Sequence, residues 1–208
     1  DRFKEVETMS KKEVLNYFGF PSEAIKRPLI FVIQHVISGE VYDAAKQIKC
    51  TLDAVTPLNA NCIINYPNSD MGSREIVNVI DRYRSLSNVR ITRNIPRKEF
   101  VNLLRNIDLL AGNSSMALLE GAFLKIPAIN VGNRNKNRMN SGNVIFTDYD
   151  TGKIGKIAKK ILFDKVFSKK LRNCKSAYGN GKSAEKIVCF LKKLDKSRKQ
   201  LTAKDNSY

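Results

Sequence analysis

The sequence has few of the residues from which metal centres are built. It contains one histidine, His35, and its four cysteines form no C-x-x-C pair. Zinc sites need Cys and His ligands at close spacing, so the common zinc motifs are excluded. We expect neither a metal nor a cofactor. We expect the cysteines to be free thiols of a cytoplasmic protein, with Cys50 and Cys62 in the core.

Long hydrophobic runs are also missing. The longest begins at Pro28 and stops at Gln34 and His35, far short of the ~20 residues that a transmembrane helix needs. The first residues do not form a signal peptide. We therefore expect no membrane partner. The chain begins with Asp1 rather than Met, and we expect it to be part of a longer protein.

Acidic residues are scarce, with 20 Asp and Glu against 37 Lys and Arg and a net charge of +17. The excess lies at the end: from Lys153 onward there are 17 basic and four acidic residues, whereas 1–152 is nearly balanced. Such a segment could attract nucleic acid, an acidic partner or a membrane surface. It lacks interleaved aromatics and nucleic-acid motifs, which favours a solvated helical face and a basic, disordered tail at 196–208. We expect no nucleic-acid partner.

Apolar runs alternate with helical periodicity along the rest of the chain. Strands are predicted at 28–36, 61–66, 89–92, 107–111, 126–131 and 143–146. Helices are predicted at 10–19, 41–55, 72–86, 96–106, from about 115, at 151–163 and at 181–195. Continuous apolar strands between helices are typical of a parallel sheet covered on both faces. The sequence therefore predicts an α/β fold, a doubly wound parallel sheet in one domain, 1–195.

Ligands of such sheets bind beyond the carboxyl ends of the strands, where polar segments follow four of the predicted strands. His35 ends the first strand and could donate to a phosphate or move a proton, although a structural role is equally open. Asn68 and Arg74, after the second strand, could hold substrate or order the loops. Arg134 and Arg138 lie in a basic loop and could neutralise a diphosphate. Each of these segments could also be an ordinary exposed turn.

The segment 111–120 is the most informative. A strand ends at Gly112 and a helical pattern begins near Ser115, which predicts free backbone N–H groups and two hydroxyls, of Ser114 and Ser115, suited to an anion. Glu120, about one and a half turns later, could accept hydrogen bonds from a ribose. Helix capping by Asn113 or Ser114 is the simpler interpretation of the segment alone.

These motifs, in this order, carry a resemblance to a known family. The chain resembles the C-terminal domain of hydrolysing UDP-N-acetylglucosamine 2-epimerases, especially the branch that feeds sialic-acid synthesis. The resemblance extends from about Ser10 to Leu194. Its carriers are His35 with Glu40, 66–74, 112–115 with Glu120, 132–134 with Arg138, and 178–181.

The resemblance implies one half of a GT-B architecture, in which Rossmann-like domains flank a cleft. This chain would be the UDP-binding half. Its partners would be a UDP-sugar, the N-terminal domain of the same enzyme and, as an open alternative, a second copy in a homodimer. The implied UDP contacts are Asn113, Ser114, Ser115, Glu120 and Arg134, with Asn68, Arg74 and Arg138 in support. The implied catalytic residue is His35.

In the family, UDP is eliminated from UDP-GlcNAc to leave 2-acetamidoglucal, and water then adds to give N-acetylmannosamine. Key carboxylates come from the N-terminal domain, so we expect this chain alone to be inactive.

The chain departs from the family pattern in three places. Val36 replaces the proline of His-Pro-Val-Thr, Met116 and Ala117 replace small residues, and Asn133 and Asn137 alter the basic loop. Because of these departures, the resemblance does not specify which sugar the UDP-sugar substrate carries.

Two alternatives remain. One is the donor-binding domain of a GT-B glycosyltransferase, but many retaining members have a second Glu where this chain has Gly112. The other, ranked lower, is a basic module that binds nucleic acid or a scaffold.

Overall fold

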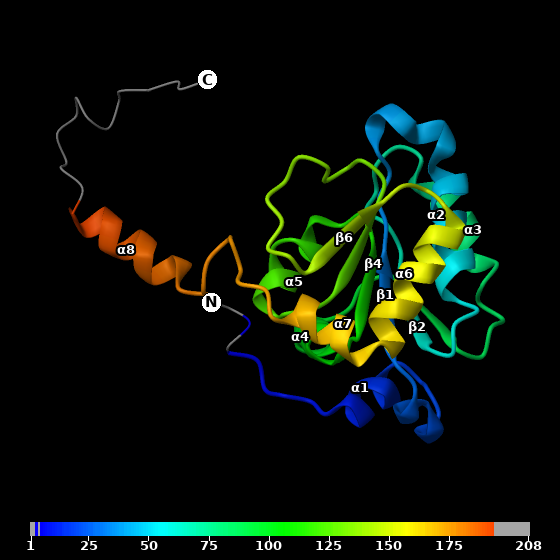
Figure 1. Ribbon diagram of the computed structural model, residues 1–208, viewed down its shortest axis with the longest axis horizontal. Coiled ribbons are helices and arrows are strands. Elements are labelled where there is room, and N and C mark those ends of the chain that lie inside the picture. The colour runs from blue at the N-terminus through cyan, green and yellow to red at the C-terminus, as the bar shows by residue number, and fades with distance from the viewer. Residues whose placement is uncertain (1–2, 4, 194–208) are drawn as a thin grey trace.

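The computed structural model describes residues 3 and 5–193, and its centre is a six-stranded sheet in which every pairing is parallel. The strand order is β3-β2-β1-β4-β5-β6 (Figure 1). The strands are β1 (Leu29–Ile33), β2 (Asn61–Asn65), β3 (Val89–Thr92), β4 (Leu109–Gly112), β5 (Ala128–Val131) and β6 (Val144–Thr147). The predicted doubly wound α/β fold is confirmed.

Helices cover both faces of the sheet. They are α1 (Lys11–Tyr17), α2 (Ala44–Val55), α3 (Ser73–Asp81), α4 (Arg97–Asn106), α5 (Glu120–Phe123), α6 (Thr151–Phe163), α7 (Lys165–Arg172) and α8 (Ser183–Lys193). Short 3-10 helices are η1 (Ser22–Lys26), η2 (Ser38–Asp43) and η3 (Ser115–Ala117). The sequence did not predict α7, η1 or η2. The predicted tail at 196–208 lies outside the described residues.

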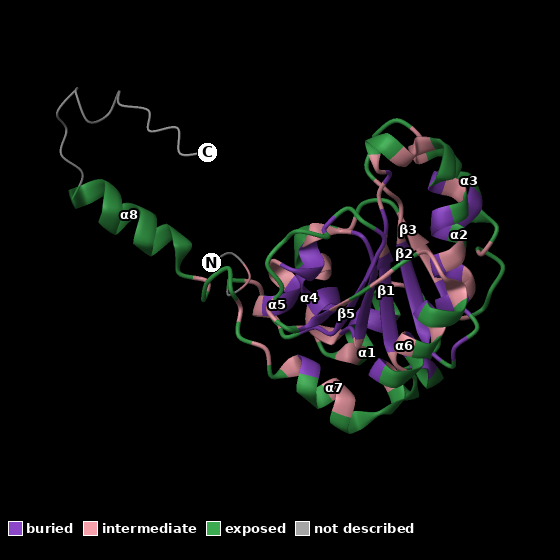
Figure 2. Cartoon of the chain, turned by 45° about the horizontal axis from the view of Figure 1, so that its top comes forward, coloured by how far each residue is buried: buried purple, intermediate pink, exposed green. Residues whose placement is uncertain are grey.

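Alternating side chains of the strands build a core on each face, because successive residues of a strand point to opposite sides. Ile30 and Val32 of β1 pack against α2, α3 and α6, while Leu29 and Phe31 pack against α1 and α4. The central strands are therefore buried on both faces (Figure 2). This explains why they read as uninterrupted apolar runs in the sequence.

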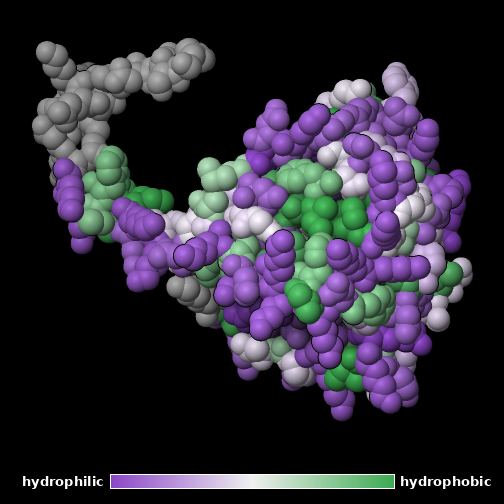
Figure 3. Space-filling view, viewed as in Figure 1, coloured by the Kyte–Doolittle hydropathy of each residue, from purple (hydrophilic) through white to green (hydrophobic). Residues whose placement is uncertain are grey.

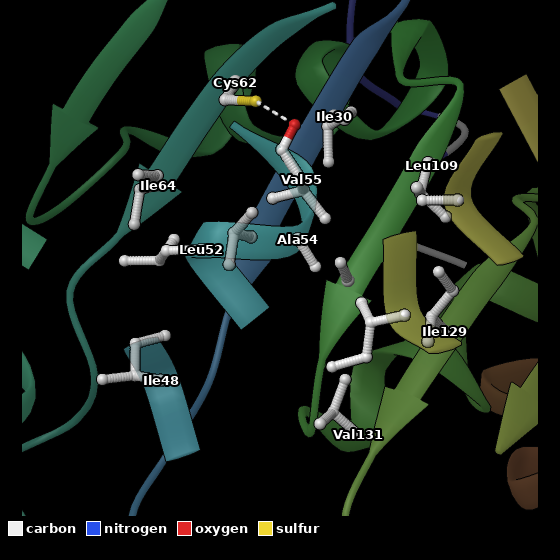
Figure 4. Close-up of a cluster of buried hydrophobic side chains, with 14 of the residues drawn as sticks. Ile30, Ile48, Leu52, Ala54, Val55, Cys62, Ile64, Leu109, Ile129 and Val131 are labelled. Atoms are coloured by element: carbon white, nitrogen blue, oxygen red, sulfur yellow. Dashed lines mark hydrogen bonds between the residues drawn. The ribbon is translucent and has the colours of Figure 1, made fainter. Parts of the chain in front are cut away.

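The core on the α2 side contains Cys62, whose Sγ lies 3.9 Å from the carbonyl of Val55 (Figure 4). Burial raises the pKa of this thiol to about 12, so it packs as a small apolar residue. All four cysteines are free thiols. The core location predicted for Cys62 is confirmed, whereas Cys50 is only half-buried.

The helix predicted from about residue 115 is much shorter than expected. The chain forms the three-residue η3 and then the four-residue α5. It stops there because Lys125 adopts a left-handed conformation (φ 58°) and Pro127 follows two residues later. So short a helix sums few peptide dipoles, and the positive potential at Ser115 is correspondingly small.

Helix α8 stands apart from the sheet and its covering helices (Figures 1 and 2). None of its residues is buried, and Ile187, Val188, Phe190 and Leu191 are each at least half exposed. Hydrophobic and hydrophilic side chains both reach its surface (Figure 3). Within the described residues, no helix is long and apolar enough to cross a membrane.

Candidate active site

The sheet reverses its direction of winding between β1 and β4, the position at which α/β sheets bind ligands. Ile33 of β1 pairs with Gly112 of β4, so the loops that follow these strands begin side by side. Gly112 has a φ of +129°, and a Cβ there would lie 2.1 Å from the carbonyl oxygen of Ile33. Only glycine lets the two strands end this closely together.

Asn113 joins the two loops through its side chain. Its Oδ1 accepts from the backbone N–H of His35 at 2.7 Å, and its Nδ2 donates to the backbone carbonyl of His35 at 2.8 Å. The side chain is fully buried, and both amide atoms are used in this bridge. Asn113 thereby fixes the backbone of His35, and its contact with UDP stays a prediction.

The ring of His35 has a defined tautomer. Nδ1 accepts from the backbone N–H of Asn68 at 3.3 Å, so the proton of the neutral ring lies on Nε2. Burial, and then the positive charge of Arg134, lower the pKa of His35 below its usual 6.5. At neutral pH the residue is thus an uncharged ring with one N–H to donate.

Buried asparagines hold the loop after β5 against this bridge. Asn135 donates through Nδ2 to the carbonyl of Asn113 and to Oδ1 of Asn130, both at 2.8 Å. Nη1 of Arg134 also reaches the carbonyl of Asn113, at 3.3 Å. Arg134 itself is exposed, so its guanidinium lies beside His35 and Asn113 and still faces solvent. This cationic group and the neutral histidine suit an anionic ligand.

Ser114 and Ser115 follow directly after this bridge and are half-buried. The hydroxyl of Ser114 accepts from the backbone N–H of Met116 at 3.3 Å and caps η3. The capping interpretation of the sequence is thus confirmed for Ser114. A role for the two serines in binding a diphosphate stays a prediction.

Glu120 lies at the start of α5 and lines a groove of about 370 Å³ to which neither His35 nor Arg134 contributes. The groove also contains Phe3, Phe123 and residues of the 178–183 segment, including Tyr178 and Gly181. The structure thus brings together two of the motifs that the resemblance used. Neither Ser114 nor Ser115 is among the lining residues of this groove.

The three supporting residues, Asn68, Arg74 and Arg138, are all exposed. Asn68 contacts His35 through its backbone, and its side chain donates to Asp70 at 2.6 Å. Arg74 lies in the first turn of α3, and Arg138 lies in the loop after β5. Among the described residues, no hydrogen bond or ion pair joins either arginine side chain to His35, Asn113 or Arg134.

A basic groove of about 520 Å³ runs beside the edge strand β6. Lys136, Lys153 and Lys156 line it together with Phe146 and Ile157. Apolar side chains are exposed over β6 and are surrounded by hydrophilic ones (Figure 3). In the part of the chain that the structure describes, no cluster of His, Cys, Asp and Glu could hold a metal ion.

Sequence reasoning missed the contacts of Tyr149 and Asn135. Tyr149 donates to Oε2 of Glu40 at 3.2 Å across 109 positions of the chain. Asn135 is 1% exposed although it lies in a loop of otherwise charged and polar residues. No local pattern marks either residue, because each is defined by a partner that is distant in sequence.

A sequence model of the family described as UDP-N-acetylglucosamine 2-epimerase matches residues 3–192 of this chain. The chain belongs to the UDP-N-acetylglucosamine 2-epimerase family. Curated relatives of the chain include the hydrolysing UDP-N,N'-diacetylbacillosamine 2-epimerase of Legionella pneumophila. That protein is 32% identical over 96% of this chain and 51% of its own length. The UDP-N-acetylglucosamine 2-epimerase of Neisseria meningitidis is 29% identical over 70% of this chain and 37% of its own length.

Solved structures of UDP-GlcNAc 2-epimerases share the fold. The structure from Neisseria meningitidis bound to UDP-GlcNAc has a TM-score of 0.71 at 17% identity, over 88% of this chain and 49% of that one. The structure from Methanocaldococcus jannaschii with UDP-GlcNAc and UDP has a TM-score of 0.63 at 21% identity, over 88% and 49%. The chain thus spans about half, or less, of the length of the relatives that it matches.

Proposed function

We propose that this chain is the UDP-binding half of a hydrolysing UDP-GlcNAc 2-epimerase. The observation that carries the proposal is the joining of His35, Asn113 and Arg134 at the point where the sheet reverses its winding. Membership of the epimerase family and the hydrolysing relative from Legionella support it.

In the proposed reaction, the bond between C1 of the sugar and the UDP oxygen breaks while a proton leaves C2. The products of this elimination are UDP and 2-acetamidoglucal, and water then adds across the double bond to give N-acetylmannosamine. The departing diphosphate gains negative charge, so donors aimed at it lower the barrier. Arg134 and Nε2–H of His35 would supply such donors, Ser114 and Ser115 would bind the diphosphate, and Glu120 would bind the ribose.

The groups that act on C2 and C3 are proposed to come from an N-terminal domain of the same cytoplasmic protein. The exposed apolar side chains of α8 support the presence of such a neighbour, since a free apolar face of this kind is costly in water. A homodimer is compatible with the same face. The isolated chain would then bind UDP but not epimerise a UDP-sugar.

The sugar has two candidates. The resemblance favours UDP-GlcNAc and the branch that supplies sialic-acid synthesis, whereas the Legionella relative is named for UDP-N,N'-diacetylbacillosamine. Offering both sugars to the complete protein separates the candidates by their relative kcat/KM. A glycoside as product, in place of the free sugar, would instead indicate a glycosyltransferase.

Calorimetric titration with UDP tests the binding role. We expect Ser114→Ala and Glu120→Ala each to weaken binding about tenfold, the value of one hydrogen bond to a charged group. Ser85→Ala and Glu23→Ala serve as matched controls, because both residues are exposed and outside the loops of the candidate site. Absence of UDP binding by the unmodified chain at millimolar concentration would contradict the proposal. Epimerisation by the isolated chain would contradict its expected inactivity.

A further inference from the structure

Tyr149 lies between β6 and α6, and its hydroxyl donates to Oε2 of Glu40 at 3.2 Å. The same carboxylate oxygen accepts from Nε2 of Gln47 at 2.5 Å, and the side chain of Gln47 is 5% exposed. Glu40 lies in η2, within the loop that follows β1 and contains His35. The tyrosine therefore connects the end of the sheet at β6 to the loop that follows β1.

The phenol of Tyr149 also closes over the turn at Gly132. A Cβ at position 132 would lie 2.2 Å from the hydroxyl oxygen and 2.3 Å from Cζ of Tyr149, and Gly132 has a φ of +78°. The backbone N–H of Gly132 donates to the carbonyl of Thr147 at 2.8 Å. Glycine is thus required both by the backbone conformation and by the ring that packs on it.

The loops that follow β1, β5 and β6 consequently meet at the phenol of Tyr149. The loop from Gly132 carries Arg134 and Asn135, which contact the carbonyl of Asn113. Burial, and then the charge of Glu40, raise the pKa of Tyr149, so its hydroxyl stays a donor at physiological pH.

We propose that Tyr149 is a positioning residue: by binding Glu40 and covering Gly132, it holds the Arg134 loop against the His35 loop in the form that binds the leaving group. The identity of that leaving group, UDP, rests on the function proposed above. The inference that Tyr149 holds the two loops together does not depend on the proposed function.

Removal of one hydroxyl tests this role. Tyr149→Phe keeps the ring over Gly132 and deletes the hydrogen bond to Glu40. Tyr83→Phe is the matched control, because Tyr83 donates to Asp53 at 2.5 Å beyond the far end of α3, away from the loops of the candidate site. Both variants lose a tyrosine–carboxylate hydrogen bond, so a general loss of stability affects both.

Two measurements on the 208-residue chain decide the outcome. We expect Tyr149→Phe, but not Tyr83→Phe, to weaken UDP binding about tenfold. We also expect amide hydrogen exchange to become about fivefold faster, or more, at Glu40, Gly132 and Lys136. The N–H groups of these residues are hydrogen-bonded in these loops. Glu40→Ala, which removes the acceptor, should weaken binding in the same way, and the double variant should lose no more than Glu40→Ala alone.

Unchanged exchange at these three amides in Tyr149→Phe would overturn the proposal. Faster exchange with unchanged UDP affinity would overturn the part of the proposal that connects the positions of the loops to ligand binding. If the unmodified chain binds no UDP, the proposed function fails, and hydrogen exchange alone still decides whether the tyrosine holds the loops together.

Discussion

At the scale of single residues, the candidate site depends on how asparagine amides are used. Asn113 uses its whole side chain to fix the backbone of His35, and Asn135 fixes the carbonyl of Asn113. Within the described residues, Oδ1 of Asn135 is buried without a hydrogen-bond partner. The other amide atoms of Asn113 and Asn135 are hydrogen-bonded, and moving the loops would leave them buried without partners, so these bonds hold the loops in a narrow set of conformations.

The environment of His35 predicts its titration. NMR should give a midpoint below 6.5, and Arg134→Gln should raise it only in part, because burial is the larger cause of the lowered pKa. The folded state holds this proton less tightly than the unfolded chain, so the contribution of His35 to the free energy of unfolding is complete above pH 6.5 and falls as the pH drops below it.

Arg138→Gln is the control for this titration. Arg138 lies in the same loop as Arg134, but its charge does not contribute to the shifted pKa of His35. The assignment is direct because the chain has one histidine. A midpoint at or above 6.5 in the unmodified protein would contradict the prediction.

At the scale of elements, the junction after β4 depends on close approach of two strands rather than on a long helix. η3 and α5 are short, so few aligned peptides are available to attract an anion. The position of the loop comes from Gly112, which lies against the carbonyl of Ile33.

Gly112→Ala is expected to lower the free energy of unfolding by about 3 kcal/mol or more, since the new Cβ meets backbone and the φ of +129° is strained for alanine. Chemical denaturation measures the change. Gly39→Ala provides the control, because a Cβ at Gly39 meets nothing within 4 Å and should change stability by less than about 1 kcal/mol. Equal effects of the two substitutions would show that close approach does not determine this junction.

At the scale of the whole molecule, α8 is a helix whose apolar side chains are left exposed by the rest of the described chain. Its apolar side chains face solvent, whereas Phe167 of α7 packs against the core and under Lys160. None of its residues is buried, so α8 adds no buried side chain to the core of the sheet and its helices. Its apolar face is therefore available to a neighbouring domain or a second copy.

Phe190→Ser should change the stability of the 208-residue chain by less than about 0.5 kcal/mol, because Phe190 is 65% exposed. Phe167→Ser should cost about 2 kcal/mol or more, since it removes packing from the core. In the complete protein, Phe190→Ser should become strongly destabilising if the N-terminal domain covers α8. Thermal unfolding of both lengths of protein measures this difference, and an equal effect in both would contradict the idea.

The sequence by itself determined the α/β class, the six strands and the edge of the sheet at which the polar loops gather. Local patterns were sufficient for this, since strands buried on both faces must be apolar throughout and parallel strands end on one side. The order of the motifs was also sufficient for the family resemblance.

Only the tertiary structure decided which residues the candidate site residues contact. It shortened the helix after Ser115, joined the side chain of Asn113 to the backbone of His35, put Glu120 in a groove lined by the 178–183 segment, and joined Tyr149 to Glu40 across 109 positions of the chain. The physical reason is that hydrogen bonds and close packing join residues that are distant in sequence. The periodicity of one segment does not identify the distant residues that its side chains contact.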